Sequence, residues 1–133
     1  MRTFVENVPS YWKPFMTGYW YQLVGDPEIP ADRLDMEKRS PLFHIENIKA
    51  PLLIGQGAND PRVKKQESDQ MVAAMREAGK QVDYIVFPDE GHGFTRPEND
   101  RRFYAETEQF LAKHLGGRFE PASESERVDE FRR

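Results

Sequence analysis

The sequence has 133 residues, of which 38% are hydrophobic and 32% are charged, as expected for one soluble globular domain. Its 19 basic and 23 acidic side chains give a net charge of -4, and because the two signs are interspersed, no nucleic-acid partner is expected. The absence of cysteine excludes disulfides, thiolate zinc sites and cysteine nucleophiles.

The sequence shows no signal for a membrane or for export. No apolar run approaches the length of a membrane span. The N-terminal stretch MRTFVENVPSYW has neither the basic region nor the apolar region of a signal peptide. We therefore expect a soluble chain without a membrane partner, cytoplasmic by default.

The first predicted element is a helix rich in aromatic side chains, from about Pro14 to Val24. Trp12, Phe15 and Tyr19 recur at helical spacing and form one broad apolar face. We interpret this face as part of the core. The alternative is an aromatic wall over a substrate pocket.

A second, shorter helix is predicted from Ala31 to Arg39, because Pro30 suits a first helical turn and the Ser-Pro pair after Arg39 disfavours continuation. Residues 41–49 are expected to form a loop or a single turn with packed apolar side chains. His44 lies there without a partner at metal-ligand spacing. We interpret it as a structural or merely exposed histidine.

The central part of the chain predicts a strand, a helix and a second strand. The apolar run that begins at Pro51 predicts a buried strand at about Leu52–Gly57. Apolar residues at helical spacing predict a helix at Gln66–Ala78, and the next strand is expected at Val82–Phe87. Such a unit is right-handed and its two strands are parallel. The fold class is therefore α/β, with a small parallel sheet and flanking helices.

The chain closes with a helix and a polar tail. Apolar residues at helical spacing predict a helix from Pro97 to about Leu115. We assign residues 1–119 to one α/β segment. Residues 120–133 are polar and charged, and we predict a disordered or loosely attached tail there.

Each predicted strand is followed by a titratable residue, Asp60 after the first and His92 after the second. Taken singly, an aspartate in Asn-Asp-Pro or a histidine between glycines is typical of a turn. Together they sit at the same edge of a parallel sheet, where a carboxylate can orient an imidazole and the imidazole can activate a serine. The pair therefore predicts two members of a hydrolase triad.

Two stretches carry a resemblance to a known family, namely SPLFHIENIKAPLLIGQGANDPRV and VDYIVFPDEGHGFTRPEN. Through them, residues from about Tyr11 to Pro121 resemble the C-terminal end of the α/β-hydrolase domain of the prolyl oligopeptidase family, which includes acylaminoacyl peptidases and dipeptidyl peptidases. The resemblance implies a serine peptidase with Asp60 as triad acid and His92 as triad base. It also implies that Arg62 contacts a substrate carbonyl, although a surface salt bridge is the alternative for this residue.

The sequence departs from this family in one respect that matters for activity. None of its serines lies in a G-x-S-x-G nucleophile elbow; they are Ser10, Ser40, Ser68, Ser123 and Ser125. The resemblance implies that the nucleophile, the oxyanion donors and a β-propeller precede this segment in a full-length member. We therefore expect the chain to be inactive alone and to need a peptide substrate and the upstream half of the catalytic domain.

Several alternatives stay open. An esterase or dienelactone-hydrolase-like enzyme would use the same acid and histidine. A non-catalytic, truncated α/β module could instead pair with a second copy through its exposed sheet edge. A metal site made of His44, His92 and His114 would require three distant segments to converge, so no metal or other cofactor is expected.

Overall fold

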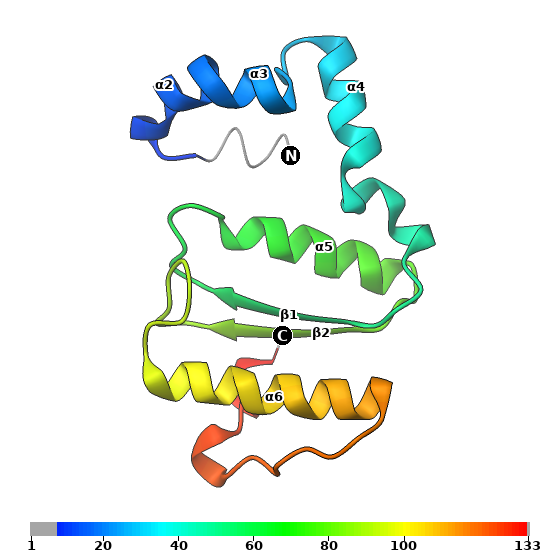
Figure 1. Cartoon of the computed structure of the whole chain (residues 1–133), viewed down its shortest axis with the longest axis vertical. Coiled ribbons are helices and arrows are strands. Elements are labelled where there is room, and N and C mark those ends of the chain that lie inside the picture. Colours follow the sequence, from blue (N-terminus) through cyan, green and yellow to red (C-terminus); the bar gives the residue numbers. More distant parts are fainter. Residues whose placement is uncertain (1–7, 133) are drawn as a thin grey trace.

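A parallel two-stranded sheet lies between two helices in the computed structural model, which describes residues 8–132 (Figure 1). The strands pair in parallel from Leu52 opposite Val82 to Gly57 opposite Phe87. These are the strand bounds that the sequence predicts. The elements are β1 (Leu52–Gly57), α5 (Lys65–Glu77), β2 (Val82–Phe87) and α6 (Pro97–Leu115). The predicted α/β arrangement with flanking helices is confirmed.

Alternation along β2 divides the apolar core into two layers, because successive side chains of a strand point to opposite faces. Tyr84 and Val86 pack with Val72 of α5 on one face. Phe87 is fully buried on the other face, where Phe103 of α6 packs against it. The two helices therefore cover opposite faces of the sheet, as Figure 1 shows.

Helix α6 approaches β1 very closely at Gly55. A Cβ atom at this position would lie 2.5 Å from the Phe103 ring, far inside van der Waals contact. Glycine here lets the ring lie directly on the strand backbone. This contact fixes α6 on the sheet, and with it the loop that leads from β2 into α6.

A helical arm precedes the sheet and lies beyond α5 in Figure 1. It confirms the two N-terminal helices that the sequence predicts. Its elements are a 3-10 turn (Ser10–Trp12), α2 (Lys13–Phe15), a π-helical stretch (Met16–Trp20), α3 (Tyr21–Val24), α4 (Pro30–Arg39) and a 3-10 segment (Pro41–Asn47). His44 contacts the Lys38 carbonyl oxygen through Nε2 at 2.7 Å, which ties the last segment to the end of α4.

The aromatic side chains of the arm do not form the buried face that the sequence suggests. Met16 is buried, whereas Phe15 and Tyr19 are 47% and 55% exposed. These two rings contact each other in a tilted arrangement, with centroids 5.2 Å apart. The core interpretation is therefore wrong for Phe15 and Tyr19, because no second layer of the described chain covers them.

The tail packs against the sheet in the structure, which differs from the expectation of a disordered or loosely attached tail. It forms short 3-10 turns at Glu124–Glu126 and Asp129–Phe131. Val128 is fully buried, and the Phe131 ring lies 5.3 Å from the Phe87 ring. Arg132 Nη2 donates to Glu106 at 2.6 Å. Two apolar residues within a polar stretch thus suffice to cover part of β2.

None of the helices in residues 8–132 is both long and apolar enough to span a bilayer. Residues 1–7, which include most of the stretch on which the expected lack of a signal peptide rests, lie outside the described residues.

Candidate active site

Asp60 lies on the loop that follows β1, with its side chain 7% exposed. Its Oδ1 atom accepts hydrogen bonds from the backbone N–H groups of Arg62 at 2.8 Å and Val63 at 2.9 Å. This is the local turn that an aspartate forms with the backbone two and three residues ahead. The turn saturates Oδ1 and leaves Oδ2 to face the neighbouring loop.

His92 lies on the loop that follows β2 and meets the acid there. Its Nδ1 atom is 2.9 Å from Asp60 Oδ2. The two residues come together because the carboxyl ends of adjacent parallel strands open at the same edge of the sheet. The predicted approach of Asp60 and His92 is confirmed. The imidazole is 45% exposed, so one side of it stays accessible from solvent.

The electrostatics of the pair define the tautomer of the histidine. Burial of Asp60 opposes ionisation, but hydrogen bonds from Val63, His92 and Arg62 outweigh it, so the pKa of this carboxyl lies below its ordinary value. An ionised carboxylate can only accept hydrogen bonds, so the proton of a neutral His92 must sit on Nδ1. The Nε2 atom then carries a lone pair that can accept a proton from a hydroxyl group.

The two loops are held together by their main chains. The Asn59 backbone N–H donates to the Glu90 carbonyl oxygen at 2.9 Å. The side-chain Nδ2 of Asn59 donates to the Pro88 carbonyl oxygen at 2.7 Å. Gly57 makes this approach possible, since a Cβ atom there would lie 2.2 Å from the Gly91 carbonyl oxygen. Only glycine allows the histidine loop to cross so close to the end of β1.

Glu90 is a member of the site that the sequence analysis missed. Its side chain is 1% exposed, and it accepts hydrogen bonds from groups on the same loop and on α6. Burial opposes ionisation, yet these bonds from Thr95, Asn99 and Arg96 lower the pKa of Glu90. A signal was present in the sequence, because this acidic residue directly precedes the Gly-His-Gly turn and polar residues follow it at short range.

Of the other candidate residues, Arg62 contacts the pair through its backbone, and the two other histidines lie elsewhere. Arg62 contributes its backbone N–H to Asp60, and its side chain is exposed. His114 lies near the end of α6, with its ring centroid 4.6 Å from that of Phe110. The structure therefore does not bring His44, His92 and His114 together. Residues 8–132 contain no group of three or more His, Asp or Glu side chains that could hold a metal ion.

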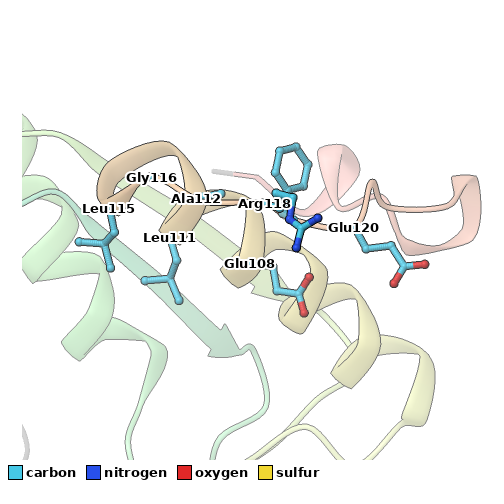
Figure 2. A pocket seen from close by; sticks show the side chains of 8 residues that line it. Glu108, Leu111, Ala112, Leu115, Gly116, Arg118 and Glu120 are labelled. Atoms are coloured by element: carbon cyan, nitrogen blue, oxygen red, sulfur yellow. The ribbon is translucent and has the colours of Figure 1, made fainter.

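A hollow of about 450 Å³ lies elsewhere, between the outer face of α6 and the chain that follows it (Figure 2). It is lined by Glu108, Leu111, Ala112, Leu115, Gly116, Arg118, Phe119 and Glu120. Neither Asp60 nor His92 lines it. Because a catalytic site requires groups that can transfer protons within hydrogen-bond reach, the acid and the histidine define the candidate site and this hollow does not.

An acid and a histidine on the loops after two adjacent parallel strands, in that chain order, are the arrangement found in α/β-hydrolases. The sequence model of the prolyl oligopeptidase family matches residues 3–118. Dipeptidyl aminopeptidase BIII of Pseudoxanthomonas mexicana is 53% identical over 121 residues, 91% of this chain and 17% of that protein. Dipeptidyl peptidase family member 6 of Caenorhabditis elegans is 40% identical over 117 residues, 88% of this chain and 16% of that protein.

Solved structures agree with this assignment. A puromycin-hydrolysing peptidase of Mycobacterium tuberculosis superposes with a TM-score of 0.74 at 30% sequence identity, over 92% of this chain and 18% of that one. A puromycin hydrolase gives a TM-score of 0.68 at 28% sequence identity, over 90% of this chain and 17% of that one. The chain belongs to the prolyl oligopeptidase family of serine peptidases. It spans about a sixth of the length of the two curated relatives described above.

Proposed function

We propose that this chain is the C-terminal catalytic segment of a serine peptidase and supplies the triad acid, Asp60, and the triad base, His92. The hydrogen bond of 2.9 Å between Asp60 Oδ2 and His92 Nδ1 carries the proposal. Membership of a serine peptidase family supports it. The nucleophilic serine and the oxyanion donors belong to the upstream half of the catalytic domain.

The proposed mechanism follows from the tautomer of His92. Its Nε2 atom takes the proton of the serine hydroxyl as the oxygen attacks the scissile carbonyl carbon, and the imidazolium then returns that proton to the leaving amine. Asp60 holds the ring with Nδ1–H toward the carboxylate and stabilises the positive charge that forms on it. In the second half of the reaction, water takes the place of the serine hydroxyl: it gives a proton to His92 as it attacks the acyl-enzyme carbonyl carbon. The imidazolium then protonates the serine oxygen, and the acyl group leaves as a carboxylic acid.

The chain by itself is proposed to be inactive, because neither partner of the pair has a hydroxyl group to activate. None of the five serines lies in a nucleophile elbow. Ser68, for example, lies in α5 and donates its hydroxyl to Gln56 Oε1 at 2.6 Å. Its role in the described structure is to tie α5 to the end of β1.

For the complete enzyme we propose release of dipeptides from the N-termini of peptides. The relative with 53% identity is a dipeptidyl aminopeptidase, whereas the acylamino-acid-releasing enzymes that also match are 30 to 39% identical. Arg62 is proposed to contact a substrate carbonyl. Its exposed side chain and its place two residues after the triad acid support this role. An Arg62→Ala variant should then raise KM more than it lowers kcat.

The test uses the complete enzyme, with this segment joined to its upstream half, and a dipeptidyl p-nitroanilide as substrate. His92→Ala removes the proton acceptor, and Asp60→Asn leaves the imidazole in the wrong tautomer, so each should lower kcat by about 10⁴. His114→Ala is the matched control and should retain activity. An active His92→Ala enzyme would contradict the proposal. Hydrolysis of p-nitrophenyl esters without hydrolysis of any dipeptidyl anilide would favour the esterase alternative.

A further inference from the structure

Glu90 is a fully buried carboxylate that takes no part in the proposed proton transfers. Its Oε2 atom accepts from the Thr95 backbone N–H at 2.9 Å and from the Thr95 hydroxyl at 3.2 Å. Its Oε1 atom accepts from the Arg96 N–H at 3.0 Å and from Asn99 Nδ2 at 2.9 Å. A buried charge is strongly unfavourable unless it is hydrogen-bonded, so these four hydrogen bonds are what stabilises the carboxylate in the interior.

Glu90 and its four donors lie on opposite sides of His92 along the chain. Glu90 comes two residues before the histidine, while Thr95 and Arg96 follow it and Asn99 lies in the first turn of α6. The carboxylate therefore joins the two ends of the histidine loop to each other and to the helix. The Glu90 carbonyl oxygen also accepts the Asn59 N–H at 2.9 Å, which joins this loop to the acid loop.

Inside the closed loop, one short backbone hydrogen bond spans the histidine, from the Gly93 N–H to the Gly91 carbonyl oxygen at 3.1 Å. Gly91 and Gly93 flank His92, and Gly93 adopts a φ of 109°, a conformation that favours glycine. Glycines on both sides permit many conformations of the loop when it is not tied down. The position of the imidazole relative to Asp60 thus depends on the ties at the two ends of the loop.

We infer that Glu90 is a positioning residue that holds His92 with Nδ1, and not Nε2, against Asp60. The inference rests on the proposed function, since it concerns the proposed catalytic histidine. Replacement of Glu90 by glutamine would keep one acceptor oxygen and direct an amide N–H₂ group at two donors. The ends of the loop would separate, and the ring would lose its fixed orientation toward the acid.

The test measures the tautomer of His92 in the 133-residue chain by long-range ¹H–¹⁵N NMR, at a pH at which the imidazole is neutral. The wild-type chain should show mainly the Nδ1–H form. Asp60→Ala removes the acceptor and defines the signal of an unpaired ring. Glu90→Gln should shift His92 most of the way to that signal. Glu106→Gln is the matched control, because it removes a carboxylate on α6 that pairs with Arg132 and leaves the histidine loop unchanged.

The outcomes separate the two proposals. A Glu90→Gln chain that is folded and keeps the wild-type tautomer overturns the inference on Glu90 but leaves the acid–histidine pair in place. A wild-type chain with the same signal as Asp60→Ala overturns the pair itself. If Glu90→Gln does not fold, Asn99→Ala decides, since it removes one of the four donors and should shift the tautomer in the same direction by a smaller amount. An unchanged tautomer in that variant counts against the inference.

Discussion

The region from β1 to α6 and the helical arm before it use the same kinds of residues in opposite ways. Phe87, at the end of β2, is fully buried among aromatic rings of the loop, of α6 and of the tail. Phe15, in the arm, is 47% exposed, and its ring contacts that of Tyr19 one turn further along the helix. The contrast shows that an aromatic side chain stabilises a fold only where a second layer covers it.

The two regions also differ in how their loops are held. The loops after β1 and β2 carry the site, and backbone hydrogen bonds such as Ala58 N–H to the Phe87 carbonyl oxygen at 2.9 Å join them. In the arm, the exposed contacts are mostly between residues close in sequence, such as the ion pair of Arg39 with Asp35 at 2.7 Å. Exposed pairs of this kind contribute little to stability. Substitutions in the two regions should therefore differ strongly in effect.

The largest effect is expected for Phe87→Ala. The ring lies 4.6 Å from that of Phe94 and 5.3 Å from that of Phe131, and its removal would leave a cavity between three elements. The free energy of unfolding should fall by about 3 to 5 kcal/mol. Urea denaturation of the 133-residue chain measures this change. A loss below about 1 kcal/mol would mean that the sheet region is not the rigid part of the molecule.

A smaller loss is expected for Gly57→Ala. Its new methyl group would lie 2.2 Å from the Gly91 carbonyl oxygen, and a backbone atom cannot move aside as a flexible side chain can. We expect a loss of about 1 to 3 kcal/mol and a displaced histidine loop. Gly18→Ala in the arm is the matched control, because a Cβ atom there meets nothing within 4 Å. It should leave stability unchanged or raise it by up to about 1 kcal/mol. Equal losses in both variants would remove the distinction between the regions.

The stability of the site region should depend on pH. The pKa values of Asp60 and Glu90 are both lowered in the folded chain. Their contribution is therefore complete above the unfolded carboxyl pKa of about 4 and is lost as the pH falls through the folded values. An Asp60→Asn, Glu90→Gln double variant should be less stable than the wild type at pH 7 and should lose less stability on acidification. Thermal unfolding of the two chains between pH 7 and pH 3 measures the stability at pH 7 and its loss on acidification. If the stability of the wild type and of the double variant falls in parallel with pH, the prediction is contradicted.

The smallest effect is expected for Phe15→Ala in the arm. Because nearly half of this side chain is exposed and its ring contacts lie within the same helical segment, the free energy of unfolding should change by about 0.5 kcal/mol or less. The urea titration used for Phe87→Ala provides the direct comparison. A loss approaching that of Phe87→Ala would show that the arm packs as tightly as the sheet region.

The sequence alone determined the local elements and the two residues at their ends. Strands β1 and β2 were predictable because a short apolar run bounded by turn residues reports strand structure without any knowledge of the rest of the chain. Helix α6 was predictable from its helical period and its proline start. Asp60 and His92 followed from these elements, since the end of each parallel strand must open at the same edge of the sheet.

The tertiary structure alone decided which apolar side chains are covered by another element and which are exposed. The burial of Val128 and the packing of Phe131 depend on the space that α6 leaves over β2, and a polar tail gives no local sign of it. The exposure of Phe15 depends on the absence of a covering layer among the described residues, although its spacing is that of a buried face. Glu90 became part of the site only when its donors converged on it, because its hydrogen bonds to Thr95 and Asn99 follow no regular period in the sequence.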